Sequence, residues 1–252
     1  ASLMAAAMFA YASKVYGARS EAALKSFAAD LKSRALKAWT WADANPSVLY
    51  HNNDDSKQAG SGGLASGNQE VDDATRLISK FNAAVHLFEI TGESSYKTFA
   101  ESNWTKVLGS AGPTEWDMEK ADEAVYFAQL DGVSASVSTA IISQTVSNIG
   151  NQLGNAAKDP YRAYLKDYTW SSNQIKMAQA RLFQHLAKRG SGDNASKAAA
   201  AAEDYVHYLH GVNPLGMVYL TNMKKVGAEH SASTIFHTWF ADKSKWDQTT
   251  SS

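Results

Sequence analysis

The sequence YVHYLHGVNPLGMVYLT at residues 205–221 is the most informative stretch of the chain for the fold. An amphipathic helix is predicted to end at Gly211, because glycine readily takes the left-handed conformation that closes many helices. Asn213 and Pro214 then fix the direction in which the chain leaves the helix. The apolar and aromatic residues that follow indicate, by themselves, only a helix stop and a buried loop.

Helical periodicity continues through most of the chain. In residues 20–45 apolar side chains recur at helical spacing, and Pro46 ends the pattern because it disfavours the α conformation in the residue before it. The Ala-rich residues 1–16 lack the basic start of a signal peptide and predict a core helix. Further helices are predicted at residues 71–91, 96–108, 118–130, 136–153, 171–188 and 195–209.

Strand signals are weak throughout, and the chain contains no Asn-Gly hairpin dipeptide. About eight helices, most of them joined by short glycine-containing turns, predict an all-α fold of consecutive antiparallel pairs. Residues 50–68 are polar and glycine-rich and predict a long loop. Such a loop is either a wall of a binding cleft or a surface loop, and both interpretations stay open.

The composition excludes several kinds of partner and site. Lys and Arg number 24 against 25 Asp and Glu, so the net charge of −1 creates no overall field that attracts nucleic acid or an anionic membrane. Cysteine is absent, which excludes disulfides, thiolate zinc sites and cysteine nucleophiles. No apolar run reaches the roughly 18–20 residues of a membrane span. A neutral ligand fits this composition best.

Four motifs follow one another along the chain: WTWADANP at residues 39–46, AAVHLFEITGESSY at 83–96, YTWSSN at 168–173 and GVNPLGMVYL at 211–220. They resemble, in the same order, motifs of glycoside hydrolase family nine. Each is weak alone, but four in sequence over nearly the whole chain are specific. The resemblance implies an (α/α)6 barrel of six helical hairpins, with a substrate cleft formed by loops at one end.

The resemblance also implies an incomplete barrel. Eight helices are fewer than twelve, so residues 1–252 are expected to be part of one barrel catalytic domain that lacks its N-terminal and extreme C-terminal segments. The family's general base lies in an Asp-Ala-Gly-Asp motif before the Trp-rich helix, and no such motif precedes Trp39. Its general acid is a glutamate beyond a histidine segment, and no glutamate follows Glu229.

Inverting hydrolysis needs one protonated and one ionised carboxyl about 6.5–9.5 Å apart. The chain alone is therefore expected to lack the catalytic acid and base. Two acidic clusters, Asp54-Asp55 and residues 70–73, could replace them, but adjacent carboxylates of this kind are more often helix caps and solvated charges.

The candidate substrate-binding residues follow from the resemblance, because sugar sites combine flat aromatic faces with hydrogen-bonding groups. Trp170 matches a position where the family stacks a sugar ring, and a core role is its alternative. Trp116 resembles part of a Trp-Asp step on a helix bordering the cleft, and Tyr219 belongs to the Val-Tyr step after the Asn-Pro motif. His237 matches a cleft histidine, although a lone histidine is more often structural. Trp239 stands where the family usually has arginine, so this subsite is expected to differ.

The implied function is hydrolysis of a β-linked polysaccharide or oligosaccharide by inverting acid/base chemistry, with this chain carrying the substrate-binding half. Cellulose-type β-1,4-glucan is the default substrate. The alternatives are a non-catalytic carbohydrate-binding remnant and a helical scaffold without a sugar site.

Cofactors and partners follow the same resemblance. No cofactor is expected, and His207 and His210, three residues apart, are weak evidence for zinc. A structural calcium at residues 52–55 is a minor alternative, because this loop offers oxygen ligands without the spacing of a recognised calcium loop. The expected partners are the glycan and either the remainder of the same polypeptide or a second copy. The family favours a secreted or periplasmic location in a bacterium.

Overall fold

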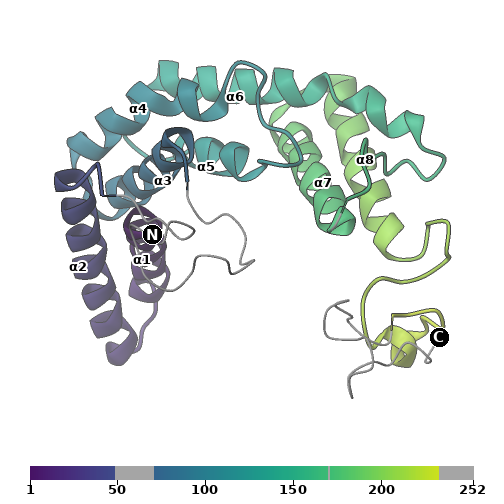
Figure 1. Cartoon of the computed structure of the whole chain (residues 1–252), viewed down its shortest axis with the longest axis horizontal. Coiled ribbons are helices and arrows are strands. Elements are labelled where there is room, and N and C mark those ends of the chain that lie inside the picture. The colour runs from purple at the N-terminus through teal and green to yellow at the C-terminus, as the bar shows by residue number, and fades with distance from the viewer. Residues whose placement is uncertain (49–70, 170, 233–252) are drawn as a thin grey trace, which may run out of the picture. The chain divides into compact units, whose positions relative to one another are not determined.

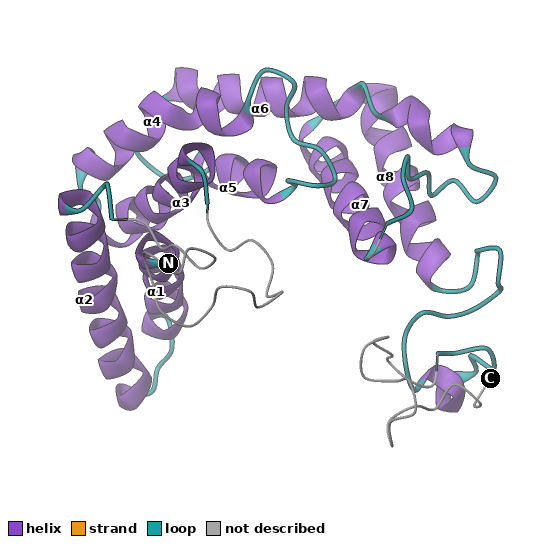
Figure 2. Ribbon diagram, viewed as in Figure 1, coloured by secondary structure: helices purple, strands orange, loops and turns teal. Residues whose placement is uncertain are grey.

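The computed structural model describes residues 1–48, 71–169 and 171–232. Within these residues the chain is helical, without a strand, as Figure 2 shows. Two isolated backbone bridges join His210 to Val218 and Val218 to Ser231. The predicted all-α class is confirmed.

Every predicted helix is present, with boundaries that differ from prediction by at most three residues. The largest differences lie at the ends of two helices and the start of a third. The elements are α1 (Ser2–Gly17), α2 (Ala22–Ala44), α3 (Asp73–Thr91), α4 (Ser94–Leu108), α5 (Glu119–Phe127), α6 (Ala135–Gly150), the 3-10 helix η1 (Leu153–Lys158), α7 (Ser172–Arg189), α8 (Gly192–Leu209) and the 3-10 helix η2 (Met223–Val226).

The chain forms two compact units. Unit 1 consists of Ala1–Ala111 and Glu119–Ile142, and unit 2 consists of Gly112–Met118 together with the described residues from Ser143 onward. Helix α6 begins in unit 1 and ends in unit 2.

Unit 1 is built from helical hairpins. Helix α1 packs against α2 and α3, and α3 packs against α4 (Figure 1). The two-residue turn between α3 and α4 contains Gly92, whose φ of 73° is the left-handed conformation that glycine adopts without strain. In the core, the Phe81 and Phe127 rings meet edge to face with centroids 5.8 Å apart. This packing holds α3 and α5 together.

Helix α1 differs from the expected core helix. It buries only Ala6, Ala10 and Ser13, whose small size lets α2 and α3 approach closely. Phe9 is partly buried and packs against the core, whereas four large side chains on the opposite side are exposed. The prediction of a helix is confirmed, and that of a core helix is wrong for this exposed face. This exposed α1 face consists of Met4, Met8, Tyr11 and Val15.

Unit 2 is organised around the α7/α8 hairpin. Helix α7 buries Leu182 and Phe183, and the Phe183 ring packs against Tyr205 of α8 with centroids 5.9 Å apart. Gly112, in the segment before α5, lies so close to α6 that a Cβ at this position would be 2.2 Å from the side-chain amide nitrogen of Asn148. The segment before α5 is thereby fixed against the end of α6.

Long and short connections alternate along the chain. Turns of a few residues join α1 to α2, α3 to α4 and α7 to α8. The longer connections precede α3, α5 and α7, and a further segment follows α8. In unit 2 the segments 112–118, 151–171 and 210–232 are of this second kind, and they carry the aromatic residues Trp116, Tyr168 and Tyr219 described next.

Candidate functional site

The end of α8 follows the predicted stop. Gly211 has a φ of 109°, and the side chain of the buried Asn213 organises the loop beyond it. Its Nδ2 donates to the carbonyl oxygens of Tyr208 at 2.7 Å and Met217 at 2.8 Å. Its Oδ1 accepts from the backbone N–H groups of Leu215 at 3.1 Å and Met217 at 3.3 Å. The sequence indicated a buried loop, but the loop is partly exposed, since Leu215 is 69% exposed.

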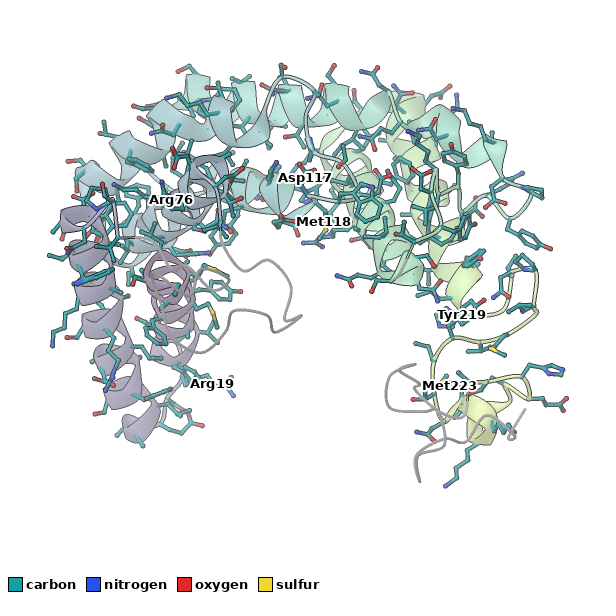
Figure 3. All side chains as sticks on the ribbon, viewed as in Figure 1. Arg19, Arg76, Asp117, Met118, Tyr219 and Met223 are labelled. Carbon is teal, nitrogen blue, oxygen red and sulfur yellow. The ribbon has the colours of Figure 1, made fainter. Side chains whose placement is uncertain are left out.

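Tyr219 lies in this loop, just beyond α8 (Figure 3). Its backbone N–H donates to the carbonyl oxygen of Leu209 at 2.9 Å. Its half-buried ring stacks on that of Tyr208, with centroids 6.3 Å apart and an angle of 25° between the planes. The predicted site residue Tyr219 is therefore one member of a stacked pair of tyrosines.

Tyr208 is also in contact with the first turns of α7. The ammonium of Lys176 lies 4.1 Å from the centroid of the Tyr208 ring and 4.9 Å from that of Tyr168. The same ammonium donates to the Tyr168 hydroxyl at 3.1 Å, and Tyr168 is 63% exposed. Burial, followed by the neighbouring Tyr168, raises the pKa of Tyr208, so its hydroxyl stays protonated. Tyr168, Tyr208 and Tyr219 form the tyrosine cluster of unit 2.

The loop before α7 reaches this cluster through two further tyrosines. The Tyr205 hydroxyl donates to the carbonyl oxygen of Tyr164 at 2.6 Å, and the rings of Tyr161 and Tyr208 lie 6.4 Å apart. Burial, and then the charge of Glu115, raises the pKa of Tyr205. Glu115 belongs to the segment before α5, so that segment lies near the same group of tyrosines.

Trp116 follows Glu115 and is 55% exposed. It lies in a turn before α5 rather than on a helix, which corrects the predicted placement. The turn forms because Oδ1 of Asp117 accepts from the Thr114 backbone N–H at 2.6 Å and from its hydroxyl at 2.9 Å. These bonds satisfy backbone groups locally and end the turn where α5 starts.

The backbone around the tyrosine cluster is constrained. The non-glycine residues with positive φ in the described part of the chain are Arg162, Ser171 and Asn222, at 54°, 68° and 62°. All three belong to unit 2. Such conformations cost free energy and persist where the surrounding structure holds them, often near functional sites.

Three of the five predicted site residues fall outside the described residues: Trp170, His237 and Trp239. Their roles stay predictions. The helix start expected after Trp170 is present, because α7 begins at Ser172.

A family model described as glycosyl hydrolase family 9 matches residues 1–252. The chain belongs to glycosyl hydrolase family 9. The order of motifs that suggested this family is therefore confirmed, and a comparison with curated proteins finds no match.

Solved structures of family 9 proteins share the fold of this chain. A family 9 protein of Bacteroides ovatus is 21% identical with a TM-score of 0.73, covering 91% of this chain and 41% of its own. A family 9 endoglucanase, J30, is 19% identical with a TM-score of 0.69, covering 90% and 39%. AaCel9A in complex with a cellobiose-like isofagomine is 21% identical with a TM-score of 0.67, covering 88% and 39%. This family 9 chain thus spans about two fifths of the length of these neighbours, and the incomplete (α/α)6 barrel is confirmed.

The acidic residues at the start of α3 serve the helix itself. The Asp72 carboxylate accepts from the backbone N–H of Thr75 at 2.7 Å and caps α3, as interpreted from sequence.

No group of three or more metal-ligating side chains occurs in the described part of this family 9 chain. Asp54, Asp55 and the calcium interpretation of residues 52–55 lie outside the described residues. In the described residues, no helix is long and apolar enough to cross a membrane.

Sequence reasoning did not predict the tyrosine cluster as a group. Tyr161, Tyr164 and Tyr168 recur within eight residues of a segment that is not an α-helix, which is the one sequence signal that could have indicated it. Lys176 gave no signal, because a lysine near a helix start is ordinarily solvated.

A second polar cluster, in unit 1, was also not predicted. The Lys14 ammonium donates to Glu89 and to the Tyr126 hydroxyl, and that hydroxyl lies 2.7 Å from Oε2 of Glu89. Nε2 of His86 lies 3.1 Å from Oε1 of Glu123, yet that oxygen has no hydrogen bond of good geometry among the described residues. The cluster joins α1, α3 and α5, whose contributing residues are far apart in sequence.

Proposed function

We propose that this chain carries the substrate-binding part of a β-glycan hydrolase, with cellulose-type β-1,4-glucan as the default substrate. The observation that carries the proposal is the tyrosine cluster beside the Asn-Pro loop of a family 9 chain. A solved neighbour holds a cellobiose-like isofagomine, which favours a β-linked glucan over other glycans.

The chemistry of the tyrosine cluster suits a sugar. A pyranose ring has apolar faces that stack on aromatic rings and hydroxyl edges that need hydrogen-bonding groups. Tyr168 and Trp116 offer exposed aromatic surface, and the tyrosine hydroxyls donate and accept hydrogen bonds. The balanced charge of the chain matches a neutral polymer. His237, Trp170 and Trp239 are proposed to extend this surface.

Proton transfer is assigned to residues other than those of the tyrosine cluster. The 252 residues contain no Asp-Ala-Gly-Asp sequence and no glutamate after Glu229. Inverting hydrolysis of the glycan therefore needs an acid and a base from the rest of a family 9 barrel. The proposed role of this chain is to bind and orient the sugar.

The rest of the barrel is also the proposed partner. Residues 1–252 are proposed to be part of one barrel domain, whose other helices cover the exposed α1 face.

A secreted or periplasmic location is proposed because a polymeric glucan is met outside the cytoplasm. Fractionation of the source cells with an antibody to the chain tests the location, and recovery only in the cytoplasm would contradict it.

A non-catalytic carbohydrate-binding protein is the second candidate. It is favoured by two carboxylates, Glu115 and Asp159, whose charges act on Tyr205. Asp159 accepts from the backbone N–H of Tyr161, and neither carboxylate has an assigned role in proton transfer. This candidate keeps the same binding residues and differs in performing no chemistry even within a longer polypeptide.

Calorimetric titration with cellohexaose and reducing-sugar release from β-glucan test the proposal together. The 252-residue chain is expected to bind cellohexaose but to show no turnover, because general acid and base catalysis each contribute about 10²- to 10⁴-fold. Tyr219→Ala and Trp116→Ala should each weaken binding about 3- to 10-fold through lost stacking. Tyr16→Ala in unit 1 is the control, and its affinity should not change.

The outcomes separate the candidates. Hydrolysis that persists through repeated purification would contradict the missing acid and base, and would return attention to the clusters at residues 54–55 and 70–73. Absence of binding to any β-glycan would reject both carbohydrate functions. Hydrolysis after addition of the remaining family 9 barrel helices would exclude the non-catalytic candidate.

A further inference from the structure

The strongest unexplained feature beside the proposed glycan site is Lys176. Its side chain belongs to the early part of α7 and is 0% exposed. Its ammonium donates to the carbonyl oxygen of Ala163 and to the Tyr168 hydroxyl. It also faces the rings of Tyr168 and Tyr208. Among the described residues, the contacts given for this charge are with the loop before α7 and with tyrosine rings.

The ammonium has no carboxylate partner among the residues that the structure describes. Removing a charge from water is costly, and ring faces with neutral oxygens offset only part of that cost. An apolar side chain of similar volume often makes a protein equally or more stable at such a position. The stability of the fold alone does not account for a lysine here.

The groups that Lys176 holds are those of the tyrosine cluster. Tyr168 is largely exposed, and its side chain is held by the Lys176 ammonium and by a hydrogen bond with Tyr208. Tyr208 is buried, and its ring carries the stacked ring of Tyr219. One buried ammonium thus fixes Tyr168 directly and Tyr219 through Tyr208.

We propose that Lys176 is a positioning residue: through its contacts with Tyr168 and the buried Tyr208, it pre-orders the rings of Tyr168 and Tyr219 as the aromatic surface for a neutral β-glycan. This inference rests on the proposed function. Pre-ordering lowers the entropy that the rings lose on binding, so it raises affinity without any contact between Lys176 and the sugar. The selected ligand is an uncharged sugar, because the buried ammonium is unavailable to an acidic one.

Replacement of Lys176 by methionine tests the proposal, since methionine keeps the length of the side chain and removes the charge. Cellohexaose affinity is expected to fall about 10-fold, while the thermal unfolding midpoint stays equal or rises. Lys188→Met is the matched control, because Lys188 is an exposed lysine near the other end of α7. Its affinity and midpoint should match those of the unmodified chain.

The two measurements distinguish positioning from a structural role. A structural role would lower the unfolding midpoint of Lys176→Met and leave the affinity of the folded protein unchanged. An affinity within twofold of the unmodified chain would overturn the proposal.

A second variant keeps the test decisive if Lys176→Met does not fold. Tyr168→Phe retains the ring and removes the hydroxyl that the ammonium holds, so affinity should fall about threefold or more. Unchanged affinity in this variant would overturn the proposal.

Failure of the proposed function gives a different pattern. If the unmodified chain binds no glycan, the near-ultraviolet circular dichroism of Lys176→Met still reports whether the tyrosine rings are held. A changed tyrosine band with an unchanged far-ultraviolet spectrum supports positioning of the rings, and identical spectra in both regions overturn it.

Discussion

Among single residues, Asn213 has the largest structural role in the loop that carries Tyr219. The last carbonyl groups of a helix have no partners within the helix, and the Asn213 amide supplies a donor to Tyr208. It bonds the loop backbone at Met217 as well. The sequence predicted that the chain turns at this residue, because the Asn-Pro pair is a local signal. The four hydrogen bonds could not be predicted, since they depend on how the following residues fold back.

Asn213→Asp is expected to destabilise the fold by about 2–3 kcal/mol, because both donor bonds are lost and a carboxylate is buried. Urea unfolding measures the change. Asn45→Asp is the matched control: Asn45 also precedes a proline at a helix end, and its Nδ2 donates to Trp41 at an exposed position. The control should cost less than about 1 kcal/mol, and equal costs would contradict the central role of Asn213.

At the scale of elements, the helices were predictable because their signals are local. Apolar periodicity, caps and stops lie within each segment, so each boundary was found to within three residues. At the start of α2 the Ser20 hydroxyl donates to the Glu21 carboxylate, and no side chain caps the helix. Contacts between elements were not predictable: Lys14 and Glu89 are 75 residues apart, and no pattern in one helix specifies its partner in another.

The start of α3 makes a pH-dependent contribution to stability. The bond from Thr75 lowers the pKa of Asp72, so the ionised cap is favoured in the folded state. The stabilisation is therefore present above the ordinary aspartate pKa near 3.9 and is lost as the pH falls through the lower folded value. Asp72→Asn should lower the unfolding midpoint at pH 6, and the difference from the unmodified chain should shrink as the pH falls below the ordinary aspartate pKa.

Asp73→Asn is the control for this cap. Asp73 pairs with Arg76, but its side chain is 90% exposed, so a smaller shift is expected at pH 6. Equal shifts for both variants would mean that general charge at the helix start, and not the Asp72 cap, stabilises α3.

For the whole molecule, family membership was predictable from the order of four motifs, although no single motif was specific. The tyrosine cluster was only partly predictable. Tyr219 was identified from its motif, whereas Tyr208 and Lys176 gain their roles from helices that pack together in unit 2. Side chains that act through tertiary contacts have no sequence spacing to reveal them.

Incomplete coverage of apolar surface leads to the last prediction. Exposed apolar patches larger than several hundred Å² seldom persist on soluble monomers, and the exposed α1 face presents two methionines, a tyrosine and a valine on one helix. In the 252-residue chain this face is expected to be covered by a second copy. Light scattering should report dimers or larger species, with binding of a hydrophobic dye by any remaining monomer.

The double variant Met4→Glu and Met8→Glu should shift this association toward monomer, because two like charges on the α1 face oppose contact with a second copy. Val226→Glu is the control, since Val226 is an exposed apolar residue of unit 2, and it should leave association unchanged. If both variants reduce association equally, the α1 face is not the contact. A dye-negative monomer of the unmodified chain that unfolds cooperatively would show that its helices close their own core, and the expectation that further barrel helices cover α1 would then be abandoned.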